Sequence, residues 1–320
     1  MAAWTLFAVL LLHGGPTAPN VTPTEAARAV ARYSDNLYAF DLRMKVTTRR
    51  LFETVVHGRK GDPKASFEFV YFPPGQAVVT TETIHDVYCN LRSKEAPQRR
   101  VERFEPADGT LQSHLAFDGT QRQSFYPRQK GGLIGGPPDN ADPFRTEIVS
   151  ILPVLGIEYC GQSFGSLFGK PGCVLRRDGA LLVLEAPLTP DRLPQAGYRA
   201  WLDPSRGMAL ARFEAYQFLP KEYRGRKLPG GGKEYISYRC VVDEFKSVDQ
   251  GLWVPVRATV SLFDGRGRHA GNLNWEHKFE IDMAQSRWNP NLGKDAFQFD
   301  FPVGTQVHDE KTGVDTVISE

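Results

Sequence analysis

Strict alternation of apolar and polar residues is the feature that most constrains how this chain can fold. Side chains on a β-strand point alternately to the two faces of a sheet, so a period of two indicates strands with one buried face. Three consecutive segments show it, with apolar residues at Ile236, Tyr238, Cys240 and Val242, then at Leu252, Val254, Val256, Ala258, Val260 and Leu262, then at Leu273, Trp275, Phe279 and Ile281. Polar residues such as Arg257, Lys278 and Glu280 take the other face. A sheet with one dry face and one wet face is typically antiparallel.

Turn sequences separate the strand-like segments. In the clearest, Asp203-Pro204-Ser205-Arg206-Gly207, proline presets φ and glycine supplies the positive φ that closes a turn. We expect a β-hairpin from Tyr198 to Tyr216, in which Ala200 and Leu202 share the face of Tyr198 and Trp201 points to the other. Similar turns recur at Asp108-Gly109, Asp118-Gly119, Asp178-Gly179, Asp249-Gln250-Gly251 and Asp264-Gly265. The chain therefore predicts a series of antiparallel hairpins.

Further strands are expected before and after these segments. They cover Leu42 to Val46, Phe67 to Tyr71, Val78 to Arg92, Val101 to Phe104, Leu111 to Phe117, Gln121 to Tyr126 and Leu181 to Leu184. Gly131 to Pro138 lacks the Gly-Lys-Ser/Thr ending of a phosphate-binding loop, so we interpret it as a flexible connection. We expect a short helix, broken at Pro153, from Glu147 to Leu155. We expect a solvated hairpin tip from Leu219 to Lys233. Phe297 to Gly313 predicts one strand, a Pro-Gly turn and a short hairpin.

One amphipathic helix is expected ahead of the strands. Thr22-Pro23-Thr24-Glu25 is a capping box with proline at the first helical position. Apolar residues follow at helical spacing, at Ala26, Ala29, Val30, Tyr33, Leu37 and Phe40. The predicted fold class is mainly β (α+β), a curved antiparallel sheet or incomplete β-barrel with an N-terminal helix and few short helices covering its apolar face.

The first residues indicate export. Ala2 to Leu12 is an uncharged apolar run that suits a signal peptide and is too short to span a membrane. Small residues and prolines follow from Gly14 to Pro19. We predict a signal peptide at residues 1–19, a single domain at residues 20–320, a periplasmic location and no membrane-spanning segment.

Composition and cysteine spacing exclude several classes of function. The formal net charge is only +2, with basic and acidic residues mixed along the chain, so neither nucleic acid nor an anionic membrane is an expected partner. The cysteines Cys89, Cys160, Cys173 and Cys240 form no Cys-x-x-Cys pair and have no histidine at zinc-ligand spacing. We predict no metal site, no cofactor and at most one disulfide, for which Cys160 and Cys173 are one candidate pair.

One motif matches a catalytic pattern. Gly161-Gln162-Ser163-Phe164-Gly165 fits the Gly-x-Ser-x-Gly elbow of serine hydrolases, with Ser163 as nucleophile. The elbow needs a buried strand before the serine and a helix after it, whereas Gly169, Pro171 and Gly172 soon stop any helix here. The histidines His85, His269, His277 and His308 stand apart, and no spacing selects a pair of acids for general acid/base work. We therefore expect no enzyme, and the Ser163 hydrolase stays an alternative.

Interior aromatic residues are candidates for lining an apolar cavity. Such residues are more often plain core, but a curved sheet with much aromatic surface can enclose a ligand. The candidate ligand-binding residues are Trp201, Phe213, Trp253, Trp275 and Phe279.

Three motifs resemble exported relatives of a known family. They are Trp201 to Gly207, Asp249 to Pro255 and Phe301 to Val307, and with the helix and the long antiparallel series they resemble the bacterial outer-membrane lipoprotein-sorting proteins, the LolA/LolB-like group. The resemblance implies an incomplete barrel wrapped around helices, with an apolar cavity for acyl chains. It favours a non-catalytic periplasmic carrier of a lipid or lipoprotein acyl chain. A structural or sensory envelope module with a protein partner is a further alternative.

Overall fold

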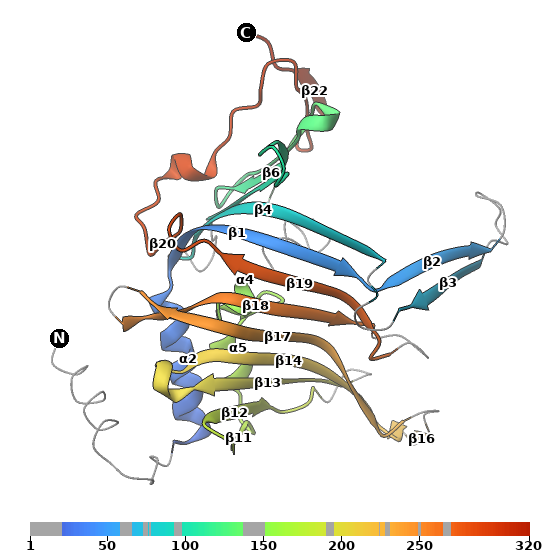
Figure 1. The fold of residues 1–320 in the computed structure, drawn as a ribbon, viewed down its shortest axis with the longest axis vertical. Helices are drawn as coiled ribbons and strands as arrows, with labels where there is room; N and C mark the ends of the chain where they lie inside the picture. The colour runs from blue at the N-terminus through green and yellow to red at the C-terminus, as the bar shows by residue number, and fades with distance from the viewer. Residues whose placement is uncertain are drawn as a thin grey trace.

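One long, curved antiparallel sheet makes up most of the protein (Figure 1). The computed structural model describes residues 21–57, 66–72, 76, 78–92, 98–136, 151–189, 195–223, 225–227, 231–248, 251–264 and 270–320. In sheet order the strands are β11 (Val174–Asp178), β12 (Leu181–Ala186), β13 (Gln195–Asp203), β14 (Ala209–Leu219), β17 (Lys233–Ser247), β18 (Trp253–Phe263), β19 (Leu273–Ile281), β1 (Ala39–Arg50), β4 (Val79–Asn90), β5 (Gln98–Phe104), β6 (Leu111–Phe117), β7 (Arg122–Tyr126), β8 (Gly131–Gly135), β21 (Gln306–Asp309) and β22 (Val314–Val317). Only β8 and β21 pair in parallel along this order. In the described chain β11 and β22 do not pair, so the mainly β, incompletely closed architecture expected from the sequence is confirmed.

Short strands extend this sheet or stand beside it. β20 (Arg287–Trp288) adds to β1, and β2 (Phe52–His57) with β3 (Ser66–Tyr71) forms a hairpin arm that projects beyond the end of β1 (Figure 1). Two ladders of two residues each join β9 (Glu158–Tyr159) to β10 (Gln162–Ser163), and β15 (Glu222–Tyr223) to β16 (Arg226–Lys227). The second ladder is the expected hairpin tip.

Helices pack against the concave, apolar face of the sheet. They are α2 (Pro23–Asn36), α4 (Ile151–Val154) and α5 (Phe164–Phe168). One-turn 3-10 helices lie elsewhere, at Pro127–Gln129 between β7 and β8, at Pro204–Arg206 between β13 and β14, and at Lys294–Phe297 after β20. The capping box is confirmed: Glu25 N–H donates to Thr22 Oγ1 at 3.2 Å, and Thr22 N–H donates to Glu25 Oε2 at 2.8 Å. Ala26, Val30 and Tyr33 are buried as the spacing predicted. The helix ends at Asn36, so Phe40, which fitted the helical spacing, lies on β1 instead.

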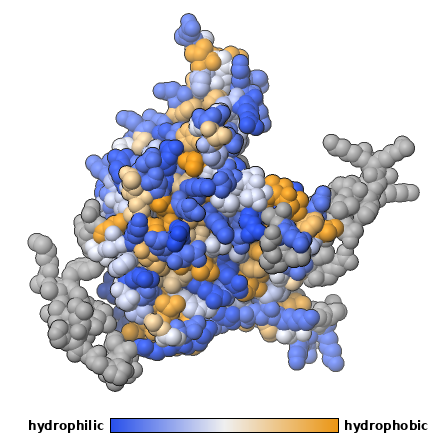
Figure 2. All heavy atoms as spheres, viewed as in Figure 1, coloured by the Kyte–Doolittle hydropathy of each residue, from blue (hydrophilic) through white to orange (hydrophobic). Residues whose placement is uncertain are grey.

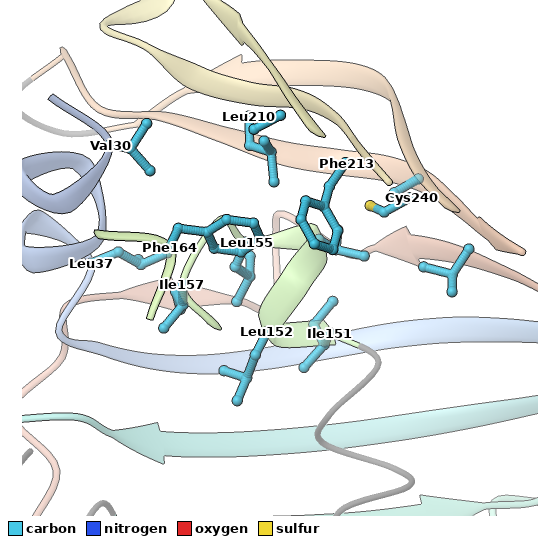
Figure 3. Close-up of a cluster of buried hydrophobic side chains, with 14 of the residues drawn as sticks. Val30, Leu37, Ile151, Leu152, Leu155, Ile157, Phe164, Leu210, Phe213 and Cys240 are labelled. Atoms are coloured by element: carbon cyan, nitrogen blue, oxygen red, sulfur yellow. The ribbon is translucent and has the colours of Figure 1, made fainter. Parts of the chain in front are cut away.

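The core lies between the helices and the sheet (Figure 3). Leu42, Met44 and Val46 alternate into it from β1, as the period of two predicted. Phe213 of β14 is fully buried near its centre, with its ring 4.8 Å from that of Phe164 and 5.0 Å from that of Tyr159. Burying one such ring contributes about 2–3 kcal/mol, so this cluster is a main source of stability.

The hairpin of β13 and β14 is confirmed, and the structure shows the surroundings of Trp201, which the sequence left open. Asp203 Oδ1 accepts the backbone N–H of Ser205 at 2.9 Å, and Gly207 takes a left-handed φ of 65° that closes the turn. Ala200 and Leu202 join the core cluster. On the opposite face, Trp201 Nε1 donates to Asp178 Oδ2 at 2.8 Å, and the Arg212 guanidinium lies 4.4 Å from the centre of its ring.

Two expectations about loops are corrected. Gly131–Gly135, interpreted as a flexible connection, is the strand β8 between β7 and β21. A Cβ on Gly132 would lie 2.5 Å from Phe301, so glycine here permits the close approach of the C-terminal segment. Pro153 lies inside α4 rather than breaking it, because a proline in the first helical turn needs no backbone donor. Residues 137–150 lie outside the described part.

The predicted strand at Phe297–Phe301 is also corrected. Phe297 ends a 3-10 helix, and the residues from Gln298 to Phe301 belong to no strand. Instead Phe299 stacks on His114 at 4.0 Å and lies 5.4 Å from Phe125, while Phe301 lies 6.2 Å from Phe125. The Pro-Gly turn leads into the hairpin of β21 and β22 as expected.

All four cysteines are free thiols in the structure. Cys89 and Cys240 are buried in the core, where burial raises the pKa of the Cys89 thiol to about 12. Cys160 is exposed and Cys173 is half-buried. The predicted signal peptide lies outside the described residues, and none of the described helices is long and apolar enough to cross a membrane.

A candidate ligand-binding cavity

A cavity of about 1050 Å³ lies beside α2, between this helix and the segment from Ile157 to Cys173. Tyr38, Leu91 and Arg92, at the adjoining ends of β1 and β4, complete its wall. Ligand pockets commonly measure about 300–1,000 Å³, so the cavity has the size of a ligand site. The helices α2 and α5 that border it lie against one face of the sheet (Figure 1).

Hydrogen bonds and close packing hold α2 and α5, the two helices beside the cavity, in place. Tyr33 Oη donates to the Trp253 carbonyl at 2.8 Å, and Ser34 Oγ donates to the Gly156 carbonyl at 2.6 Å, which fixes α2 to its neighbours. At Gly165, a Cβ would lie 2.8 Å from the Cβ of Ala31. The two helices therefore meet at small residues.

The floor of the cavity is apolar and its rim is charged. Ile157 and Phe168 line it and are almost fully buried, and Ala27, Ala31 and Leu91 add further apolar surface. Arg28, Arg92 and Lys170 are exposed cations that line it as well. Such a lining suits an amphiphile, whose apolar part lies on the floor and whose polar group lies at the rim.

Ser163 lines this cavity but does not have the setting of a hydrolase nucleophile. It caps the five-residue helix α5, and its Oγ accepts the backbone N–H of Ser166 at 3.2 Å. Its φ of −61° and ψ of 148° are ordinary extended values, and it ends the two-residue strand β10, which pairs antiparallel with β9. A nucleophile elbow is a strained turn between a buried strand and a long helix, and no histidine is among the residues that line the cavity.

The five aromatic candidates lie apart from this cavity. Phe213 and Phe279 are buried in the core on the concave face. Trp201 lies on the opposite face, and Trp275 packs edge-on against Phe52 with ring centres 5.8 Å apart. Trp253 is half-buried under Arg206, whose guanidinium is 5.4 Å from the centre of one ring. None lines the cavity, and their role in ligand binding stays a prediction.

Two histidines that are far apart in the sequence, His85 and His277, lie near each other on the concave face. His85 of β4 is buried, its Nε2 is 2.8 Å from Thr83 Oγ1, and its Nδ1 has no hydrogen-bond partner. Burial, with Arg103 and His277 nearby, lowers the pKa of His85 to about 3, so it is neutral at ordinary pH. Burial also lowers the pKa of His277, which lies 3.0 Å from Thr48 Oγ1. Over the described residues, no three His, Cys, Asp or Glu side chains gather as a metal site requires.

Comparisons with known proteins found similarity to solved structures. No protein-family model and no curated protein matches the chain. An outer membrane lipoprotein-sorting protein domain from Vibrio parahaemolyticus is similar at 11% identity, with a TM-score of 0.48 over 86% of this chain and 95% of that chain. A DUF1329 family protein from Desulfovibrio piger is similar at 12% identity, with a TM-score of 0.47 over 86% of this chain and 97% of that chain.

A third solved structure, the MucA/MucB complex of Pseudomonas aeruginosa, is similar at 10% identity. Its TM-score is 0.25 over 83% of this chain and 100% of that chain. The Vibrio domain bears the name of the group that the sequence motifs resemble. Identities of this size do not carry an activity from one chain to another.

No sequence pattern indicated the cavity directly. Its cations Arg28, Arg92 and Lys170 come from three separate segments, and each is an ordinary exposed residue in its own neighbourhood. Arg28 alone had a signal, because it lies beside the apolar stripe of a predicted helix. The Gly-x-Ser-x-Gly motif lies in a segment that lines the cavity.

Proposed function

We propose that this protein is a non-catalytic, exported binding protein of the periplasm, which carries the acyl chain of a lipid or lipoprotein in the cavity beside α2. Residues 1–19 act as its signal peptide, and the remaining chain folds as one domain. The sequence resemblance to lipoprotein-sorting proteins supports this assignment. The alternation that leaves one face of the sheet apolar supports it as well.

The single observation that carries the proposal is the cavity of about 1050 Å³ with an apolar floor. Exposed apolar surface in a concave site is costly in water, at about 25 cal/mol for each Å², and an acyl chain relieves that cost. Ile157 and Phe168 supply large side chains at the floor, while Ala27 and Ala31 leave room above it.

The aromatic candidates describe a second, deeper position for an acyl chain. Phe213 and Phe279 lie under the helices, so a chain reaches them only if α4 or α5 moves away from the sheet. The ring contacts of Phe213 with Phe164 and Tyr159 must then break. The cavity beside α2 needs no such change, and for that reason we assign it as the binding position.

A displacement assay tests the proposal. We expect the purified protein to bind the neutral fluorescent probe N-phenyl-1-naphthylamine saturably and to release it when neutral 1-monolaurin is added. A Ser166→Trp variant fills the cavity from α5, because Ser166 lines it, and should lose most of this binding. Thr316→Trp, which places the same bulk on the exposed strand β22, is the matched control.

The proposal is wrong if the wild-type protein shows no saturable probe binding. It is also wrong if Ser166→Trp binds as well as the wild type, since the ligand would then lie elsewhere. Circular dichroism and the urea midpoint of each variant show whether the fold is intact.

A further inference from the structure

The rim of the cavity carries three cations. Arg28, Arg92 and Lys170 line the cavity, and within the described chain none of them has an ion-pair partner. Arginines on the opposite face behave differently. Arg199 bonds Glu234 at 2.7 Å, and Arg239 bonds Glu214 at 2.8 Å. The three rim cations therefore differ from these two paired arginines.

The acids near the rim are already engaged. Glu158 lines the cavity but pairs with Arg99 at 3.4 Å. Glu25, which lies near Arg28, accepts both the backbone N–H and the hydroxyl of Thr22 in the capping box, each at 2.8 Å. Asp35 lines the cavity and has an interaction partner as well. The three cations of the lining thus outnumber its two carboxylates around the apolar floor.

Arg92 is held in a defined position at the rim. Its guanidinium lies 4.6 Å from the centre of the Tyr38 ring, and Tyr38 itself lines the cavity. Stacking of this kind fixes the plane of the guanidinium while leaving its edge N–H groups free to donate to a carboxylate or phosphate. Lys170, which follows α5, adds an ammonium group on a flexible side chain, and Arg28 adds a second guanidinium with several N–H donors.

We propose that the cavity selects anionic amphiphiles, with the acyl chain on the apolar floor and a carboxylate or phosphate group bound between Arg28, Arg92 and Lys170. This inference rests on the proposed function and adds the class of headgroup. The charge match explains why three cations remain unpaired around a concave apolar site: their partner is the ligand. Because all three are exposed, each contact is screened by water and salt, and selectivity comes from their sum.

A set of ligands with one chain length tests the inference. Laurate, dodecyl phosphate and neutral 1-monolaurin share a chain and differ in headgroup, and each is titrated below its micellar concentration against the N-phenyl-1-naphthylamine complex. We expect both anions to bind about fivefold or more tightly than monolaurin in 50 mM NaCl. In 500 mM NaCl that advantage should shrink, while the affinity of monolaurin stays the same.

Two double variants distinguish the effect of the rim cations from the effect of the protein's overall charge. Arg28→Gln with Lys170→Gln should lose most of the preference for anions and keep the affinity for monolaurin. Arg32→Gln with Lys278→Gln removes the same charge from exposed residues that do not line the cavity, one of them on the same helix, and should behave as the wild type.

The outcomes distinguish the inference from the proposed function. If all three ligands bind equally, or if both double variants act alike, the anionic preference is overturned and the carrier function stands. If no ligand displaces the probe, both are overturned. A preference for dodecyl phosphate over laurate supports the inference and identifies a phospholipid headgroup as the source, and the reverse preference supports it with a free fatty acid.

Discussion

The buried histidine on β4 makes the stability of this protein depend on pH in a predictable direction. The ordinary pKa of histidine is 6.5, and in the folded chain the pKa of His85 falls to about 3 because of burial and the nearby Arg103 and His277. Protons therefore bind the unfolded chain more tightly than the folded one. The stability that His85 contributes is complete above pH 6.5 and is lost progressively as the pH falls from 6.5 towards 3.

The size of the effect follows from these two values. At pH 7.5 both states hold His85 neutral and its contribution is unchanged. At pH 5.0 the unfolded chain is about 30 times more often protonated than not, which lowers the free energy of unfolding by about 2 kcal/mol. His277, whose pKa burial also lowers, acts in the same direction. For this reason the test compares slopes between variants and not the wild type alone.

The assay is urea unfolding of the wild type and His85→Gln at pH 7.5, 6.5, 5.5 and 5.0. Glutamine keeps a polar side chain near Thr83 and does not titrate. We expect the wild type to lose about 2 kcal/mol more than the variant between pH 7.5 and pH 5.0. Equal losses in the two proteins, within about 0.5 kcal/mol, would refute the reasoning, because His85 would then bind its proton as easily in the folded state.

Three further substitutions test other parts of the structure. Gly165→Ala should lower the free energy of unfolding, measured in urea, by about 1–2 kcal/mol because the added Cβ would lie too close to Ala31, although alanine normally favours a helix. Gly136→Ala is the control, since Gly136 has open space around it and the substitution should leave the free energy of unfolding unchanged. Glu214→Gln should cost about 2 kcal/mol in the same assay, since the nearly buried carboxylate bonds Arg212 and Arg239, and a loss below about 0.5 kcal/mol would contradict this. Ser163→Ala should cost about 1 kcal/mol through loss of the helix cap and leave lipid binding unchanged. A fluorophosphonate probe should label neither form, and labelling that the variant abolishes would revive the hydrolase alternative.

Much of the fold could be predicted from the sequence because it depends on local patterns. The period of two gave the buried face of β1, β18 and β19, and the capping box gave the start of α2. The alternation also placed Trp201 on the face opposite Ala200 and Leu202, but it left open whether Trp201 lines a cavity, and the structure buries it against Asp178 and Arg212. These features depend on residues only a few positions apart.

The errors arose where distant segments decide the structure. Gly132 has no side chain to mark a strand, and β8 forms because β7 and β21 supply its hydrogen bonds from both sides. Phe299 alternates with its neighbours like a strand residue, yet its ring packs on His114 and the segment pairs with no strand. The cavity is the same kind of feature, because Arg28, Leu91 and Lys170 come together only in the folded chain.

The position of the cavity also determines how a ligand must enter. The space beneath the helices is filled by Phe213 and its aromatic neighbours, while the cavity beside α2 exists before any ligand arrives. A ligand that used the space around Phe213 would wait for α4 or α5 to open, so its observed association rate would level off at high concentration. A ligand that binds beside α2 meets no such step. Stopped-flow mixing with N-phenyl-1-naphthylamine should therefore give a rate that rises linearly with concentration, and a plateau would place the ligand in the core.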